Sequence, residues 1–238
     1  MSKHSKWAKI KRAKGVTDVK RGVIFSKLSR NITIAAREGT DVTTNFKLRM
    51  AIDRALAENM PKDNIERAVE RAAKNEDGTT LESLTIDARG LSGSALLIDV
   101  VTDNRNRSFG ELRKLLGDHG CHPTEPGSMQ WLFERRGQIF IENVTDIEQA
   151  ELDAIDTGAS EIDNDETMLE VITNPEQLHA ITESLKNKKY QITSSELMMH
   201  PKTSIALAEN EYNKLQELME ILEDHADVAG VTTNAVPA

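Results

Sequence analysis

Apolar residues recur at helical spacing in the first third of the chain. Up to Gly39 they follow one another at intervals of three and four, which places them on one face of a helix. These residues are Ile24, Phe25, Leu28, Ile32, Ala35 and Ala36. Basic residues gather on the opposite face. They are Lys20, Lys27, Arg30 and Arg37. A second helix over roughly 45–58, with Thr43 and Thr44 as capping candidates, and a third after Pro61 complete a predicted helical bundle.

The pattern changes to that of strands after this bundle. Residues 81–90 and 94–102 are rich in β-branched and aliphatic side chains and predict two strands. Ser108 and Glu111 match the S-x-x-E capping box in front of an apolar helical stretch. Residues 128–133 (SMQWLF) predict one further strand. The order β-β-α-β lacks a last element to close its sheet.

A complete cycle of strand, helix, two strands, helix and strand follows from residue 135. Its elements are expected at 135–143, 146–156, 159–163, 167–173, 174–187 and 190–199. This is the split-βαβ or ferredoxin-like order. The remaining tail, from residue 209, predicts one helix and one strand. Such a pair cannot bury its own apolar face, so we expect it to close the earlier, incomplete sheet.

The predicted fold class is therefore α+β with three domains: an N-terminal helical bundle followed by two small ferredoxin-like (split βαβ) domains. We expect a basic helical nucleic-acid-binding domain over residues 1–76. A discontinuous α+β domain over 77–134 plus 203–238 surrounds an inserted ferredoxin-like domain over 135–202.

Net charge also divides the chain near residue 76, where the predicted helical domain ends. Residues 1–75 contain 18 Lys/Arg against 8 Asp/Glu, a net charge of +10, although the whole chain carries -9. The remainder therefore carries −19. A basic head on an acidic remainder can bind a polyanion at one end while the rest repels it.

The N-terminal arm is the most basic stretch. Residues 2–15 (SKHSKWAKIKRAKG) hold six Lys/Arg, no acidic residue and one Trp. Cations bind phosphates and a flat ring stacks on bases, so the arm and the basic helix face predict a nucleic-acid interface. Its candidate residues are Lys3, His4, Ser5, Lys6, Trp7, Lys9, Lys11, Arg12, Lys14, Lys20, Arg21, Lys27 and Arg30. The alternative is a solvated charge run beside a buried Trp7.

A second polar cluster is the stretch TDNRNRS at 102–108. Arginine side chains beside the start of a helix suit a phosphate or a carboxylate. The residues of this possible second anion or partner contact are Asn104, Arg105, Asn106, Arg107 and Glu125. In the alternative interpretation, Asp103 and Asn104 cap the helix and the arginines bridge domains.

The sequence contains little that supports a metal site, a cofactor or an enzyme activity. His119, Cys121 and His122 are too close in sequence to surround one tetrahedral ion, so we expect no metal and no cofactor. The phosphate-loop, dinucleotide, serine-hydrolase and zinc-protease motifs are missing from the sequence, so we expect no enzyme. One cysteine, no secretory signal and no long apolar run predict a cytoplasmic protein without a membrane or small-molecule partner. We expect a monomer.

Several longer stretches of the chain resemble the YebC family. They are HSKWAKIK (4–11), KRGVIFSKLSRNITIAAREG (20–39), LRMAIDRALAENMPKDNIERAVERA (48–72), TDNRNR (102–107), EPGSMQWLFERRG (125–137) and LEDHADVAGVTTNA (222–235). The resemblance implies a three-domain α+β protein of the cytoplasm. Some members of the family are connected with DNA binding and transcription. Others, including a mitochondrial translational activator, are connected with the ribosome.

The chain departs from the family pattern at a few positions. Lys3 replaces a usual glycine, and Arg89–Gly93 (RGLSG) replaces a glycine-rich loop. Cys121 stands where the family has a second glycine, and Ala226 precedes Asp227 where the family has an acidic pair.

The leading hypothesis is thus a non-enzymatic, DNA-binding transcriptional regulator that acts through its basic N-terminal domain. The alternative is a ribosome- or RNA-binding translation factor that helps translation of difficult stretches such as consecutive prolines. The head has no clear helix-turn-helix pair with a short glycine-bearing turn, which favours RNA, whereas the resemblance favours DNA. A third hypothesis makes the acidic part a protein-interaction module.

Overall fold

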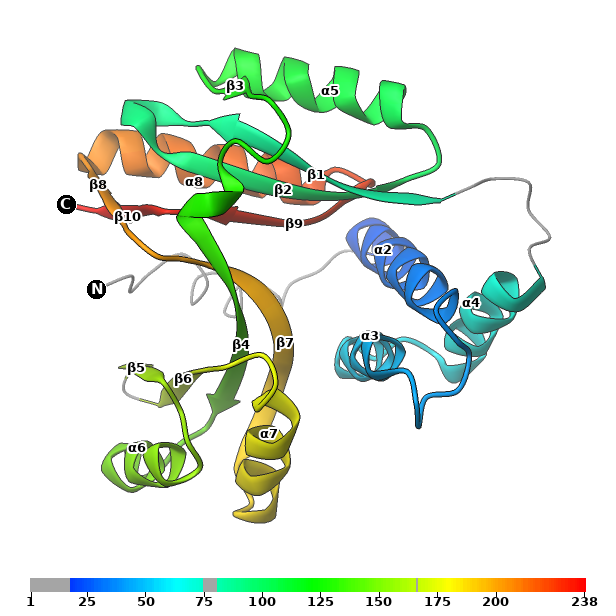
Figure 1. Ribbon diagram of the computed structural model, residues 1–238, viewed down its shortest axis with the longest axis vertical. Coiled ribbons are helices and arrows are strands. Elements are labelled where there is room, and N and C mark those ends of the chain that lie inside the picture. Colours follow the sequence, from blue (N-terminus) through cyan, green and yellow to red (C-terminus); the bar gives the residue numbers. More distant parts are fainter. Residues whose placement is uncertain (1–17, 75–80, 166) are drawn as a thin grey trace. The chain divides into compact units, whose positions relative to one another are not determined.

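Three helices form the first part of the computed structural model, which describes residues 18–74, 81–165 and 167–238. They are α2 (Asp18–Ala36), α3 (Phe46–Ala57) and α4 (Lys62–Lys74) (Figure 1). Their apolar faces meet in one core, where Ile32, Leu48 and Ala68 are fully buried. The predicted helical bundle is confirmed. We call residues 18–74 the head.

The cap of α3 differs from the expectation. Asn45, not Thr43 or Thr44, precedes the helix, and its side chain accepts a hydrogen bond from Leu48 N. The Asn45 amide also donates to the carbonyls of Ala35 and Gly39, at 2.7 and 2.6 Å. Asn45 therefore caps α3 and ties it to the end of α2, while the two threonines bond within the turn at Asp41.

A four-stranded sheet lies in the second part, residues 81–133 and 201–238, which we call the body. Its strands are β1 (Glu82–Arg89), β2 (Ala95–Thr102), β3 (His122–Pro123) and β9 (Val228–Thr233). Their order is β3-β1-β2-β9, and each pair of neighbours is antiparallel. The tail strand β9 thus lies beside β2 and completes the sheet that the first two strands begin (Figure 1). The chain also enters a two-stranded parallel sheet at β8 (Ile205–Leu207) and β10 (Ala235–Pro237).

Two helices cover one face of the body sheet. They are α5 (Arg105–Asp118) and α8 (Glu209–Asp224). Leu96, Ile98 and Val100 of β2 alternate along the strand and are fully buried in the same core as the apolar residues of both helices. The tail helix α8 contributes Leu215, Leu218, Met219 and Leu222 to this core. The aliphatic strands and the helical period read from the sequence therefore describe this core correctly.

The expectation of a strand over 128–133 was wrong. Residues 124–132 instead form a turn that ends in a short 3-10 helix, η3 (Gln130–Leu132). The buried Asp87 side chain accepts a hydrogen bond from Met129 N at 2.7 Å, and Trp131 Nε1 donates to the carbonyl of Ser128 at 2.9 Å. These bonds satisfy the backbone within the turn. Gly127, with φ at +82°, permits the left-handed conformation that the turn requires.

Residues 134–200 form a compact unit of their own. Their elements are β4 (Phe133–Glu142), α6 (Ile147–Asp156), β5 (Glu161–Asp165), β6 (Met168–Thr173), α7 (Leu178–Asn187) and β7 (Gln191–Pro201). The sheet order is β5-β6-β4-β7, so β4 and β6 are central and each helix connects strands that are not neighbours. This is the arrangement of a split-βαβ, ferredoxin-like fold.

The fold class is thus α+β, as predicted. The chain divides into two compact units, residues 134–200 and the remainder, and the finer division into three domains stays a prediction. None of the helices in residues 18–74, 81–165 and 167–238 could cross a membrane, because each is too short or too polar.

Gly137 of β4 offers a test of the packing in the second unit. A Cβ atom there would lie 2.3 Å from Thr173 Oγ1 and 2.9 Å from Leu178 Cβ. Gly137→Ala should therefore lower the free energy of unfolding of this unit by about 1–3 kcal/mol. Peptide-resolved amide hydrogen exchange should show faster exchange across residues 134–200 only.

The matched control is Gly110→Ala in α5. Nothing lies within 4 Å of a Cβ atom at Gly110, and alanine favours a helix over glycine. This substitution should leave stability unchanged or raise it. Equal exchange in the wild type and in Gly137→Ala would contradict the packing described for β4 and α7.

Candidate nucleic-acid interface

Most of the predicted interface lies outside the described residues. This applies to the arm residues Lys3, His4, Ser5, Lys6, Trp7, Lys9, Lys11, Arg12 and Lys14. Lys20 lies in the first turn of α2, and Arg21 is exposed on it. The contacts of the interface can therefore be followed for Lys27 and Arg30.

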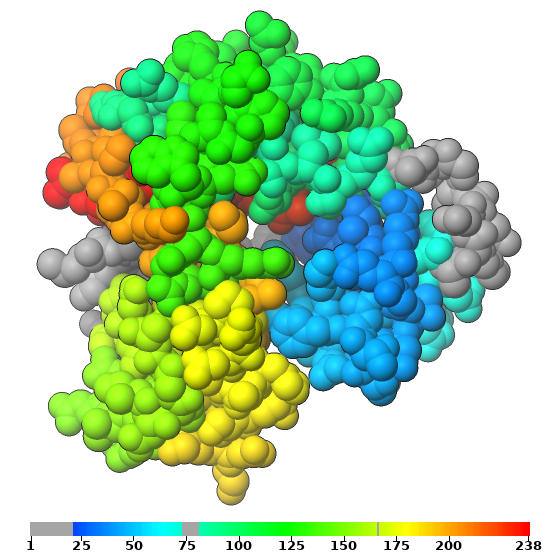
Figure 2. Space-filling model, in the orientation of Figure 1, coloured from blue at the N-terminus to red at the C-terminus, as the bar shows by residue number. Residues whose placement is uncertain are grey.

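The basic face of α2 is turned toward the body. Lys27 Nζ donates a hydrogen bond to the carbonyl of Glu223. Arg30 Nη1 donates to Asp227 Oδ1 at 2.5 Å and to the carbonyl of Ala226 at 3.0 Å. Arg37 Nη1 reaches the carbonyl of Leu81 at 2.6 Å. Consistent with this, α2 contacts β2 and β9, and the blue surface of the head adjoins the body in Figure 2.

These three cations therefore already have partners in this structure, and the binding of nucleic acid by this face stays a prediction. Their partners are oxygen atoms of the body, and three of those oxygens belong to residues 223–227, which we call the tail segment. Burial lowers the pKa of Lys27, while the Glu223 and Asp224 carboxylates act in the opposite direction. In this structure, Lys27 and Arg30 hold the head against the body.

Asp227 is at the centre of the contact, with 4% of its surface exposed. Its Oδ1 faces Arg30, as described above. Its Oδ2 accepts from Arg107 Nη2 at 2.8 Å and from Ser108 Oγ at 2.7 Å. Thr102 Oγ1 lies 3.3 Å from the same oxygen. Burial raises the pKa of Asp227, but the hydrogen bonds from Ser108, Arg107 and Arg30 together outweigh it and bring the pKa to about 2.

The TDNRNRS stretch supplies the partners of Asp227. Asn104 has an extended backbone, and its side chain accepts from Arg107 N at 3.1 Å, so Asn104 is the N-cap of α5. The predicted capping box at Ser108 and Glu111 was wrong, because Ser108 already lies inside the helix and is buried against Asp227. Of the alternative interpretation, the cap at Asn104 fits the structure, whereas Asp103 is not the cap and Arg107 bonds Asp103 and Asp227 within the body instead of bridging domains.

The proposed second anion contact is only partly available. Arg107 bonds Asp103 at 2.9 Å as well as Asp227, so its guanidinium is engaged within the body. Asp227 raises the pKa of Arg107 further. Arg105, Asn106 and Glu125 are exposed. Glu125 lies in the turn before η3, whereas Arg105 and Asn106 lie in the first turn of α5.

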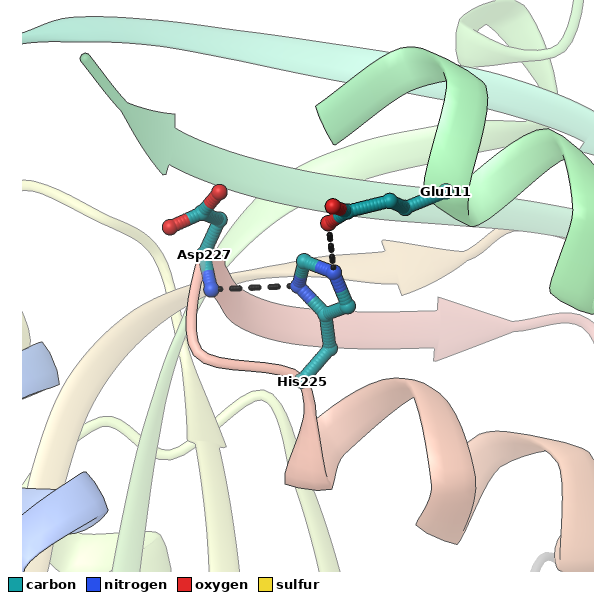
Figure 3. Close-up of side chains that lie close together, drawn as sticks. All are labelled: Glu111, His225 and Asp227. Atoms are coloured by element: carbon teal, nitrogen blue, oxygen red, sulfur yellow. Dashed lines mark hydrogen bonds and ion pairs between the residues drawn. The ribbon is translucent and has the colours of Figure 1, made fainter. Parts of the chain in front are cut away.

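Glu111, His225 and Asp227 bring ligand atoms within 4.8 Å of one another (Figure 3). The Asp227 backbone N–H donates to His225 Nδ1 at 3.1 Å, so the proton of the neutral ring is on Nε2, which lies 2.9 Å from Glu111 Oε2. A metal ion here would compete with two guanidinium groups for Asp227 and would find the Nδ1 lone pair occupied. The cluster therefore fixes the turn before β9 rather than forming a metal site.

The earlier metal candidates are also placed for other roles. Cys121 is buried, and burial raises the pKa of its thiol, which disfavours the thiolate that a metal requires. His119 Nδ1 lies 2.8 Å from the carbonyl of Leu115, and His122 stands opposite Arg89 at the edge of the sheet.

The connection between α3 and α4 is a short turn without glycine, as the sequence indicates. Residues 58–61 join the two helices, and Asn59 has φ at +59°, the left-handed conformation that glycine usually supplies in such turns. Met60 is buried in the head core. The head thus contains two helices with a short turn between them, although the sequence showed no glycine there. The exposed face of α4 is of mixed charge, with Lys62, Asp63, Glu66, Arg67, Glu70 and Arg71.

Sequence reasoning missed the role of the tail segment. Asp227 attracted notice only as part of a departure from a family pattern. Its partner Arg30 is 197 positions away, and no local signal connects the two. The only sign available in the sequence was the opposite net charge of the two ends.

Family models match almost the whole chain. The model described as "TACO1/YebC protein N-terminal domain" matches residues 5–75, and "TACO1/YebC second and third domain" matches residues 81–235. A "probable transcriptional regulatory protein" of Dictyoglomus turgidum is 41% identical over 237 residues, which cover 98% of this chain and 95% of the relative. A protein of the same description from Thermoanaerobacter pseudethanolicus is 39% identical, with 98% and 96% covered.

A solved structure is similar as well. The crystal structure of a conserved hypothetical protein from Aquifex aeolicus superposes with a TM-score of 0.86 at 32% sequence identity. The similarity covers 93% of this chain and 92% of that one.

The pKa of Asp227 predicts how acid affects the contact. A carboxylate whose pKa is lowered in the folded state contributes stability above its unfolded pKa near 3.8, and this contribution disappears as the pH falls toward 2. The shift corresponds to about 2 kcal/mol. For Asp227→Asn, the free energy of unfolding measured with urea between pH 6 and pH 2 should lack this part of the pH dependence. At pH 6 it should be lower than that of the wild type.

Asp118→Asn is the matched control, because Asp118 is an exposed aspartate on α5 of the same body. It should keep the wild-type pH dependence. If Asp227→Asn kept that dependence too, the bonds assigned to Asp227 would be wrong.

Proposed function

This chain belongs to the TACO1/YebC family, and from that premise we propose that it is a non-enzymatic regulator of gene expression that binds DNA through its basic N-terminal part. The relatives at about 40% identity are named probable transcriptional regulatory proteins. The observation that carries the proposal is the arm, which holds six Lys/Arg and no acidic residue within residues 2–15. Such a stretch binds phosphates by releasing counterions, whatever the base sequence.

The head supports DNA as the ligand. Two helices joined by a short turn are the basic unit with which many proteins place a helix in the major groove. In the head, α3 and α4 are joined in this way through the left-handed Asn59. The exposed face of α4 carries Lys62, Arg67 and Arg71, but its acidic residues offset their charge. We therefore assign affinity to the arm and orientation to the helices.

RNA on the ribosome is the second candidate ligand. Trp7 lies among the cations of the arm. Aromatic rings between cations stack on unpaired bases, which single-stranded loops of RNA display and duplex DNA does not. A translation factor of this kind would use the same arm.

Reversing charge in the arm tests the proposal. Lys6→Glu combined with Arg12→Glu should weaken binding to a DNA duplex roughly tenfold at about 0.15 M salt, and should reduce the slope of log affinity against log salt by about 2. Fluorescence anisotropy over a range of salt concentrations measures both. Lys114→Glu with Lys214→Glu changes the net charge equally on exposed helices of the body and should have little effect.

The same titrations separate the two ligands. A DNA regulator should prefer one duplex sequence over others, and this preference should survive raised salt. A ribosome-binding factor should instead co-sediment with ribosomes and lose that association on the double charge reversal. If the double reversal changed no nucleic-acid or ribosome association, the proposal would be overturned in favour of a protein-interaction module.

A further inference from the structure

We propose that the tail segment, residues 223–227, occupies a phosphate-binding face of α2 in the free protein and is displaced when a nucleic-acid backbone binds there. This inference rests on the proposed function and adds a second binding surface and its competitor. The face is formed by Lys27 and Arg30, one helical turn apart.

The tail segment offers this face the same chemistry as a phosphate. Lys27 receives the carbonyl oxygen of Glu223, while Arg30 receives the carbonyl oxygen of Ala226 and one carboxylate oxygen of Asp227. Two cations thus meet three oxygens, one of them anionic. Guanidinium and ammonium groups bind phosphate oxygens by the same charge-assisted hydrogen bonds. A sugar-phosphate backbone can therefore replace every contact that the tail segment makes here.

Release of the head leaves no buried charge without a partner. The two oxygens of Asp227 have different roles, because Oδ1 faces Arg30 whereas Oδ2 is held by Arg107 and Ser108 of the body. When Arg30 leaves, Asp227 keeps its second ion pair. Breaking a buried pair is costly when one charge is left alone. The body avoids that cost by providing Arg107 from the TDNRNRS stretch.

The turn that presents Asp227 is also fixed from within the body. The Asp227 backbone N–H donates to His225, whose other ring nitrogen bonds Glu111 of α5 (Figure 3). The backbone N–H of Val101 donates to the carbonyl of Asp227 at 2.8 Å. These contacts need nothing from the head, so the tail segment keeps its shape whether or not the head is bound to it.

The apolar cores do not hold the head to the body. The head core draws its residues from α2, α3, α4 and their connections, and the body core from residues 84–121 and 205–235. Neither core includes a residue of the other. The described contacts between the two parts are hydrogen bonds and one ion pair, and water or phosphate can satisfy the groups that make them. Ion pairs between them weaken with salt and with a competing polyanion.

Two sets of substitutions on the body side test the competition. Asp227→Asn removes the charge that holds Arg30. Glu223→Gln with Asp224→Asn removes two carboxylates that act on Lys27 and leaves the buried network around Asp227 intact. Both sets should bind a 24-base-pair DNA duplex of random sequence about three- to tenfold more tightly than the wild type at about 0.15 M salt, because the competitor is weakened. Glu209→Gln with Glu217→Gln, two exposed glutamates of α8, makes the same change of net charge as the double variant and controls for overall repulsion.

Substitutions of Lys27 and Arg30, which form the phosphate-binding face, test the head side of the same contact. Adding Lys27→Gln and Arg30→Gln to either set should abolish its gain in affinity. If both sets bound no more tightly than the α8 control, or if the gain survived without Lys27 and Arg30, the competition would be refuted. If the wild type bound nucleic acid only through the arm, the proposed function would stand and this inference would fail.

A readout that needs no base recognition separates the inference from the proposed function. Inorganic polyphosphate should shift the amide NMR signals of residues 223–230 in the wild type, because it removes Lys27 and Arg30 from the oxygens of the tail segment while the backbone bonds within the body stay in place. It should have no such effect in Lys27→Gln with Arg30→Gln. Unchanged amide signals of these residues in the wild type with polyphosphate would overturn the inference even if DNA binds the arm.

Discussion

One carboxylate joins the basic head of this chain to its acidic body. Asp227 is almost fully buried, and it bonds Arg30 of the head through one oxygen and Arg107 of the body through the other. Because a buried carboxylate requires cationic or hydrogen-bonding partners, its position dictates where α2 and the start of α5 must lie. The turn at His225, the cap at Asn104 and the side chain of Ser108 all serve to hold this group in place.

The same electrostatics explain why the basic face of α2 could be interpreted in two ways. A segment of +10 attracts phosphate and the −19 remainder of the chain through the same Coulomb interaction. In the structure, the face of Lys27, Arg30 and Arg37 is engaged by oxygens of the body. The arm before α2 carries a further six cations. Charge counting alone therefore identifies an electrostatic contact, and geometry is needed to identify its partner.

Local rules of capping and turns were less reliable than periodicity, for a physical reason. Thr43, Thr44 and Ser108 are all suitable caps, yet Asn45 and Asn104 perform the role. Several short polar side chains near a helix start can satisfy the same N–H groups, so the choice depends on which of them has another partner. Asn45 also bonds α2, and Ser108 is needed at Asp227. The turn of residues 124–132 shows the same effect, since Asp87 of β1 binds Met129 N and prevents a strand.

The sequence by itself determined the α+β class, the helical head, most strands and helices, and the basic arm, because hydrophobic period and net charge are properties of consecutive residues. Only the tertiary structure decided that Arg30 and Arg107 share Asp227, that His225 fixes the turn beside it, and that α2 faces the body. These contacts join residues up to 197 positions apart. Such pairs have no periodic or local signature, and they form only because the fold brings oppositely charged groups together out of water.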